Sequence, residues 1–424
     1  MQRSFLRYTR LLLLPLLAVG MVLAGCDSSG SNGVDNGDDG DDETATFEYP
    51  SSDYGTETAV NLLAFDLGVR TGSDESVSNN SESDLDALYT GDIDDTTLPV
   101  SGVSAEQSTY GDIASGVDLS DLTDDGSLLQ SQTLEEGDSP DPGSQVSTNE
   151  LLEYYFERAG SEDITRTDNG IVLSQFAEKM LLGTPIYGQG AAILSEFADG
   201  NVSENQAGQW DAAFGYFGFP RTLEPFLDYS GGEEGLADGN VARDIDGNGS
   251  VDLTSEYVHT WAAYAIERSA AAANTDGPSP DFARDAFEAL VEGREDIENG
   301  DDPSEHAETA LQAWESTVAV NVIHYINSMQ SNLENASGTL EGPQDDDSGD
   351  IGEDAWGEAK AFAWNLQFYS DDLTEEQLGT ILDAIGNDPP YGEMTASDYS
   401  GELQSAKETI ADAFGFDATN VAAW

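Results

Sequence analysis

A stripe of apolar residues with helical spacing runs through the C-terminal half of the chain. It comprises Leu311, Trp314, Val318, Val322, Tyr325, Met329 and Leu333. Residues three or four positions apart share one face of an α-helix, and an apolar face must be buried against other elements. Asp302 and Pro303 precede the stripe and are typical of a helix start. We therefore expect a long helix inside a bundle.

Similar spacing recurs along most of the chain after residue 148. It is found over residues 151–156, 171–182, 191–198, 257–273, 282–298, 355–368, 375–385 and 401–414, and nearer the N-terminus over 59–69. Strand-like alternation is rare. We predict an all-α fold, either one antiparallel helix bundle or two packed bundles, with long acidic loops. Residues 71–148 are rich in Ser, Asp, Gly and Thr. We expect them to be loop-rich, with either ordered or mobile loops.

The first 26 residues have the organisation of a lipoprotein export signal. Arginines form a positive start, and residues 11–22 are almost continuously apolar but too few for a comfortable membrane span. The small residues of 23–25 lead to Cys26. We predict that cleavage occurs before Cys26 and that lipid on this cysteine attaches the chain to a membrane. A cleaved secretory signal followed by an unrelated cysteine is the alternative.

Cys26 is the only cysteine in the chain. The exported part can therefore form no internal disulfide, although its compartment would permit one. Its stability must come from an apolar core, to which a bound metal can add. Residues 27–46 are rich in Ser, Gly and Asp and are predicted to be an acidic flexible tether. Residues 47–424 are then the folded domain.

Acidic residues greatly outnumber basic ones. The chain has 84 Asp and Glu against 14 Lys and Arg, a formal net charge of −70. Such self-repulsion opposes a compact fold in dilute salt, but the Debye length falls to about 3 Å at 1 M salt. We interpret the charge as adaptation to a saline habitat, with a cation-collecting surface as the alternative. Nucleic acid and anionic lipid surfaces are disfavoured partners.

Residues 244–256 follow the ligand spacing of an EF-hand calcium loop. Oxygen-bearing side chains occupy loop positions 1, 3, 5 and 9, Gly249 stands at position 6, and position 7 can offer its carbonyl. Position 12 departs from the pattern, because the carboxylate comes one place later. The predicted calcium ligands are Asp244, Asp246, Asn248, Ser250, Asp252 and Glu256. We expect a structural role for the metal, with a plain acidic turn as the alternative.

Two aromatic segments are candidates for a ligand pocket. Residues 209–220 combine aromatic side chains with glycines, and residues 356–369 combine aromatic with amide side chains. Such side chains can line a small-molecule site. The candidate ligand-binding residues are Trp210, Asp211, Tyr216, Trp356 and Trp364. The alternative, which we favour, is that both segments pack in the core.

Enzymatic motifs are missing from the sequence. It contains no G-x-S-x-G, no P-loop and no H-E-x-x-H. Its three histidines, His259, His306 and His324, are far apart in the sequence. We therefore predict no catalytic residues and no enzymatic activity.

Taken together, residues 46–424 resemble the bacterial lipoproteins of domain-of-unknown-function family 4856, which are grouped with the imelysin-like proteins. The resemblance rests on residues 47–51, 210–218, 244–257 and 356–368. It implies an all-helical fold of two related bundles, lipid anchoring in an outer membrane and an association with iron uptake.

The resemblance has two departures that bear on metal binding. Imelysin carries a His-x-x-Glu motif, whereas Ala262, Thr309 and Asn327 stand three places after the histidines here. Similar lipoproteins tend to have Trp-Asp-Glu where this chain has Ala212 after Asp211. Both departures weaken an iron or carboxylate site at these positions.

Our first hypothesis is that the chain is a non-enzymatic lipoprotein of the outer membrane or cell surface. It would bind a metal species or help a partner to take one up. Calcium is the predicted cofactor, iron or haem a candidate cargo, and an outer-membrane transporter a candidate partner. The alternative is a glycan- or peptide-binding lipoprotein of an importer, suggested by the aromatic segments. A metallopeptidase is disfavoured, because no histidine-containing metal motif is present.

Overall fold

Helices form the regular structure of the chain, and this confirms the predicted all-α fold. The computed structural model describes residues 45–71, 81–91, 93–100, 102–123, 128–131, 139–140, 143–161, 166–167, 169–201, 205–227, 241–343 and 349–424. β-Structure in these ranges is limited to isolated bridges. The predicted signal, Cys26 and nearly all of the tether lie outside the described residues. The described elements belong to one unit, Thr44–Trp424.

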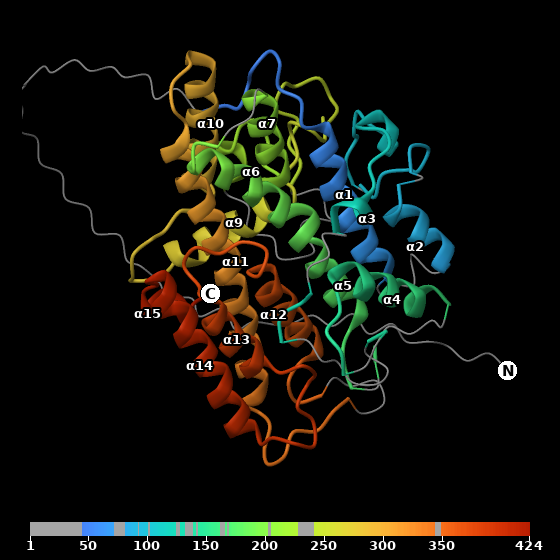
Figure 1. The fold of residues 1–424 in the computed structure, drawn as a ribbon, viewed down its shortest axis with the longest axis vertical. Coiled ribbons are helices and arrows are strands. Elements are labelled where there is room, and N and C mark those ends of the chain that lie inside the picture. Colours follow the sequence, from blue (N-terminus) through green and yellow to red (C-terminus); the bar gives the residue numbers. More distant parts are fainter. Residues whose placement is uncertain are drawn as a thin grey trace, which may run out of the picture. The chain divides into compact units, whose positions relative to one another are not determined.

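Figure 1 labels the α-helices in chain order. The described helices are α1 (Gly55–Thr71), α2 (Glu82–Tyr89), η2 (Tyr110–Asp112), α3 (Leu119–Thr123), α4 (Thr148–Ser161), α5 (Leu173–Leu181), η3 (Gly183–Gly188), α6 (Gln189–Ala198), α7 (Gln206–Phe217), η4 (Glu224–Phe226), α9 (Thr260–Ala273), α10 (Phe282–Asn299), α11 (Ser304–Leu333), α12 (Glu353–Asn365), α13 (Glu375–Ile385), α14 (Ala396–Phe414) and α15 (Ala418–Val421). No helix in these ranges has both the length and the apolar character needed to cross a membrane.

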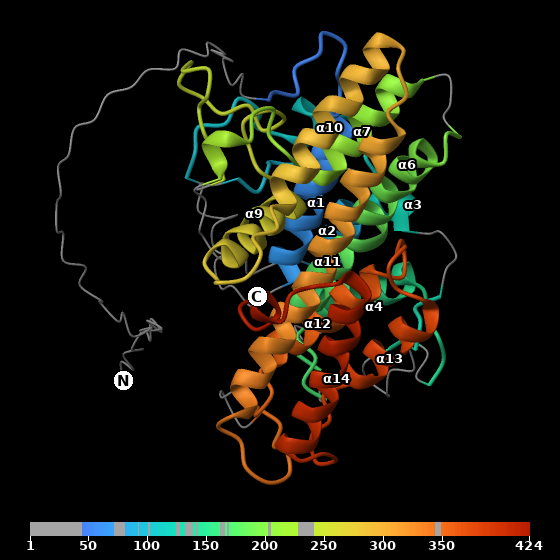
Figure 2. The same cartoon turned by 90° about the vertical axis from the view of Figure 1, so that its left-hand side faces the viewer.

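The long helix α11 is the central element of the packing. Every residue of the predicted apolar stripe from Leu311 to Leu333 is buried in it. It packs against α10 and α12 and also contacts α6, α9 and α14. Figure 2 shows α10 and α11 running side by side. The helical periodicity therefore identified the helix, whose middle part, residues 313–323, is buried on all sides.

Local capping explains where several helices begin. The Asp281 side chain accepts a hydrogen bond from the Arg284 N–H at 3.1 Å and caps α10. Thr374 and Gln377 form a reciprocal capping box at the start of α13. Each cap satisfies N–H groups that have no partner within the helix.

A second group of helices forms around α1, which packs against α5 and α7. Phe47, just upstream, is fully buried, and its ring stacks on Phe214 of α7 at 3.7 Å between centroids. The helix α7 was not predicted. Trp210 and residues 213–217 of this helix are all buried, so no apolar stripe in the sequence marks a single buried face.

The described parts of residues 71–148 contain short helices between longer irregular stretches. These parts are anchored to the core by Leu85, Tyr89 and Tyr110, all of which are buried. Tyr110 also donates to the Asp66 carboxylate of α1 at 3.2 Å. Other buried apolar residues in these parts are Leu88, Ile93, Leu98, Val117, Leu119, Leu129 and Val146, so the loop-rich segment is well anchored where it is described.

A π-helical turn, Gly183–Gly188, joins α5 to α6. Pro185 lies in this turn and has no N–H to donate. The Tyr187 N–H donates to the Leu182 carbonyl, five residues back, at 3.1 Å. Side chains from other helices satisfy nearby carbonyls: Trp261 Nε1 of α9 donates to Leu182 O at 3.0 Å, and Asn365 Nδ2 of α12 donates to Lys179 O at 3.0 Å.

Candidate metal centre

The predicted calcium loop, residues 244–256, is held closed at its base by main-chain pairing. The Arg243 N–H donates to Glu256 O at 3.1 Å, and the Val258 N–H donates to Val241 O at 2.9 Å. Ala242 and Tyr257 form an antiparallel bridge. The two ends of the loop therefore lie side by side immediately before α9.

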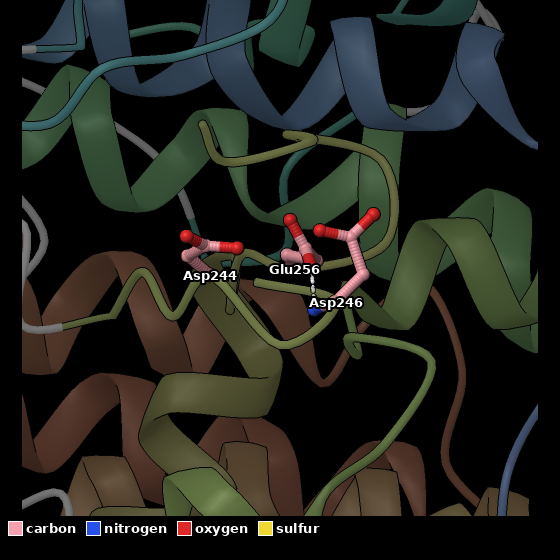
Figure 3. Close-up of side chains that lie close together, drawn as sticks. All are labelled: Asp244, Asp246 and Glu256. Carbon is pink, nitrogen blue, oxygen red and sulfur yellow. Dashed lines mark hydrogen bonds between the residues drawn. The ribbon is translucent and has the colours of Figure 1, made fainter. Parts of the chain in front are cut away.

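Three of the six predicted ligands converge within this loop. One carboxylate oxygen from each of Asp244, Asp246 and Glu256 lies within 4.8 Å of the other two. Figure 3 shows the three side chains grouped over the loop. Asp244 and Asp246 are exposed, whereas Glu256 is only 6% exposed. Carboxylate oxygens at this spacing can coordinate one hard cation.

Glu256 reaches back into the loop although it stands one place beyond the usual position. Residues 252–256 form a helical turn, in which the Glu256 N–H donates to Asp252 O at 2.7 Å. Its Oε1 accepts from the N–H groups of Ile245 at 2.8 Å and Asp246 at 3.0 Å, and its Oε2 accepts from the Asp252 N–H at 2.9 Å. The extra residue is thus absorbed by the turn, and the carboxylate still closes the loop.

The first half of the loop is shaped by Asp244 and two glycines. The Gly247 and Gly249 N–H groups donate to the Asp244 carboxylate at 2.8 and 2.9 Å. Both glycines have positive φ, 74° and 94°, which side chains disfavour. The sharp bend predicted at position 6 therefore begins at Gly247.

Asp252, the predicted ligand at position 9, does not belong to the carboxylate cluster. Its Oδ1 accepts from the Thr254 N–H at 3.0 Å, and its Oδ2 accepts from Ser255 Oγ at 2.6 Å. Burial alone would raise the pKa of Asp252, but the hydrogen bonds from Ser255, Thr254 and Gln107 outweigh it, and the pKa is lowered. The carboxylate is thus held in its charged form while it caps the 252–256 turn.

The remaining predicted ligands, Asn248 and Ser250, flank the cluster. Asn248 Oδ1 accepts from the Ser250 N–H at 2.8 Å, and Asn248 Nδ2 donates to Asp246 Oδ2 at 3.0 Å. Both residues therefore support the fold of the loop in this structure. Their oxygens remain within the loop that carries Asp244 and Asp246.

The five candidate ligand-binding residues of the aromatic segments lie in the core. Trp210, Asp211, Tyr216, Trp356 and Trp364 are each at most 7% exposed. The indole N–H groups of Trp210, Trp356 and Trp364 donate to the carbonyls of Leu290, Ile385 and Gln130 at 2.7, 3.1 and 3.2 Å. These contacts favour the core-packing interpretation over a ligand pocket.

Asp211, one of these five residues, is paired with a buried arginine. Arg294 Nε donates to Asp211 Oδ1 at 2.8 Å, and the Arg294 guanidinium lies over the Tyr49 ring. Burial raises the pKa of Asp211, and Arg294 opposes this effect. The aspartate therefore satisfies a buried cation within the fold.

The five candidate residues of the aromatic segments are absent from the lining of three cavities formed by the described residues. One of about 390 Å³ lies between α6 and α11 and is lined in part by Asp199, Glu308, Glu315, Asp371 and Asp372. Glu315 accepts from the Asp371 and Asp372 N–H groups at 3.1 and 3.2 Å, and also from Ser370 Oγ. The acidity of this cavity matches the general composition of the chain.

The three histidines occupy separate places in the fold. His259 precedes α9 and is buried, and burial lowers its pKa to about 4. His306 and His324 lie on α11, about 27 Å apart along the helix axis. His306 contacts Glu292 and Asp296 of α10 at 3.4 and 3.3 Å.

The metal candidate among the described residues is thus built from carboxylates alone. Oxygen donors suit hard cations such as calcium, whereas imidazole and thiolate favour softer metals. No family model, curated protein or solved structure matches the chain.

Proposed function

We propose that this chain is a non-enzymatic lipoprotein, anchored to an outer membrane by lipid on Cys26, whose helical domain is stabilised by calcium in the 244–256 loop. The observation that supports the proposal most directly is the convergence of Asp244, Asp246 and Glu256 on one point. Asp244 and Asp246 precede Glu256 by 12 and 10 residues in the sequence, and the main-chain pairing at the base of the loop brings the three together. A divalent cation would offset their mutual repulsion.

The position of the loop indicates what bound calcium would stabilise. The Arg221 N–H donates to Ser255 O at 2.8 Å, and the His259 N–H donates to Gly218 O at 2.8 Å. The loop therefore connects the end of α7 to the start of α9. A ligand that binds only the folded chain adds about 2.7 kcal/mol of stability at a hundredfold excess over its Kd. Calcium would therefore stabilise this junction.

Metal content and thermal stability of the purified protein test the proposal. Native protein and the Asp244→Ala/Asp246→Ala variant would be freed of metal, titrated with calcium in high salt and analysed for bound metals. We expect calcium to bind the native chain and to raise its unfolding midpoint by several degrees, and we expect neither effect in the double variant.

A matched control removes the same charge elsewhere. Asp95 and Asp301 are exposed, so Asp95→Ala/Asp301→Ala should keep both calcium binding and the calcium-dependent rise. The structural calcium site is wrong if the native chain takes up no calcium, or if the Asp244→Ala/Asp246→Ala variant binds it as well as the native chain.

A role in metal uptake, with an outer-membrane transporter as partner, is the broader part of the proposal. It is supported by the sequence resemblance, while the carboxylate donor set favours calcium over iron. The same metal analysis, repeated after incubation with iron or haem, tests it. Retention of either by the native protein would support uptake; retention of neither would remove this part and leave the calcium site standing.

A further inference from the structure

A distant segment, residues 104–107, lies directly against the calcium loop. The Glu106 N–H donates to Val251 O at 2.9 Å, and the Val251 N–H donates to Ser104 O at 2.8 Å. Ala105 and Val251 form a parallel bridge. Roughly 145 residues of sequence separate the two partners, so only the tertiary fold brings them together.

Side chains of this segment contact the loop at two predicted ligand positions. Asn248 Nδ2, at position 5, donates to Glu106 Oε1 at 2.7 Å. Gln107 Nε2 donates to Asp252 Oδ1, at position 9, at 2.8 Å, while Gln107 Oε1 accepts from the Leu253 N–H at 3.1 Å. Gln107 thus uses both ends of its amide to hold the same part of the loop.

The geometry of an amide explains why the contact to Asn248 matters. Asn248 Nδ2 donates both to Glu106 Oε1 at 2.7 Å and to Asp246 Oδ2 at 3.0 Å. The oxygen and nitrogen of the amide point in different directions, so fixing Nδ2 on these two acceptors also fixes where Oδ1 points. Asn248 Oδ1 then faces the loop, where it accepts from the Ser250 N–H. A hydrogen bond to a carboxylate is charge-assisted and therefore stronger than one to a neutral acceptor.

We propose that residues 104–107 support the calcium site from outside the loop, with Glu106 as the positioning residue for Asn248 and Gln107 as the residue that holds the 252–256 turn, which carries Glu256. This inference rests on the proposed calcium function. Glu106 is not a member of the Asp244, Asp246 and Glu256 cluster, and its role is to orient a ligand. Partners that orient metal ligands typically change metal affinity when they are removed.

Calcium affinity of four variants tests the inference. Glu106→Ala and Gln107→Ala should each weaken calcium binding by about fivefold to tenfold, the effect of losing one or two hydrogen bonds that hold a ligand or the turn that carries one. Glu106→Gln keeps an oxygen that can accept from Asn248 and should stay within about threefold of the native affinity. Glu334→Ala removes one exposed carboxylate at the end of α11 and should bind as the native chain does.

Titration calorimetry in one fixed salt concentration, well below the unfolding midpoint of each variant, gives these affinities. If Glu106→Ala and Gln107→Ala bind calcium as tightly as Glu334→Ala, the segment is only a packing partner and the inference is wrong. Equal loss of calcium affinity in Glu106→Gln and Glu106→Ala would also overturn the inference. The charge of Glu106, and not its hydrogen bond to Asn248, would then determine the affinity. If the native chain itself binds no calcium, the proposed calcium function fails first.

Discussion

Lys360 has an unusual environment for a lysine. Its side chain is fully buried, its Nζ donates to Leu382 O at 3.2 Å, and the amine lies 5.3 Å from the centre of the Trp364 ring. Burial lowers the pKa of Lys360 to about 7, although Asp383 and Asp388 favour the charged form. The unfolded chain would hold this proton up to a pH near 10.5. The folded protein therefore loses stability as the pH falls from about 10.5 to about 7, and the loss stays constant below that.

Replacing Lys360 by Met should therefore stabilise the protein. Met has a similar apolar length but no charge to desolvate, so Lys360→Met should raise the free energy of unfolding by a few kcal/mol at pH 7. The gain should fade as the pH approaches 10.5. Denaturant unfolding at several pH values measures it. Arg284→Met removes the same charge from a half-exposed site and should show no such pH-dependent gain; a destabilised Lys360→Met at every pH would contradict the prediction.

Helix contacts in this fold depend on glycines that face large aromatic rings. Gly293 of α10 faces Trp210 of α7 so closely that a Cβ atom there would lie 2.2 Å from the ring. The ring is fixed by its bond to Leu290 O. Gly190 of α6 stands in the same relation to Trp314 of α11. These ring–glycine contacts allow two helix pairs to approach closely.

Adding one methyl group at Gly293 should separate α7 from α10. Gly293→Ala should lower the free energy of unfolding by about 2 kcal/mol or more, because overpacking outweighs the better helix propensity of Ala. Gly401, inside α14, has open space around the equivalent Cβ position. Gly401→Ala should therefore raise stability by about 0.5–1 kcal/mol. Thermal unfolding of the two variants would contradict this account if both shifted in the same direction.

Periodicity was enough to predict α11, α10 and α13. In α10 and α13 the spacing marks a buried face and the start is capped by a side chain. In α11 the apolar stripe is complete from Leu311 to Leu333, although residues 313–323 are buried without a break. Periodicity failed for α7, where buried residues surround the helix and leave no stripe. The loop ligands Asp244, Asp246 and Glu256 were predicted from local spacing. Glu106 and Gln107 were not, since their relation to the loop depends on a contact between distant segments. The same limit applies to Trp210, whose partner Leu290 is 80 residues away.

The net charge acts on the whole molecule. With 84 acidic residues against 14 basic ones, most carboxylates repel one another without a compensating cation. The ion pairs found in the described residues use few of them, and the pair of Arg294 with Asp211 is buried. Long-range repulsion of this kind weakens the compact state and is screened by salt.

The unfolding midpoint should therefore rise steeply as potassium chloride is increased from about 0.1 M to about 2 M, since the Debye length falls from about 10 Å to below 3 Å. Sucrose at equal osmolality should raise it less, because it does not screen charge. Calorimetry without calcium separates the effect of charge screening from the effect of calcium binding at the 244–256 loop. A midpoint that is independent of salt would show that the charge does not limit stability.

The π-helical turn between α5 and α6 makes the number of residues there as important as their identity. A π turn holds one residue more than an α turn, which rotates everything after it by about 100° about the helix axis. Gly190 of α6, which meets Trp314 of α11, follows this turn directly. Shortening residues 183–188 by one would restore a regular α-helix but direct another face of α6 toward α11. We therefore expect insertions or deletions to be rarer than substitutions in this part of the chain.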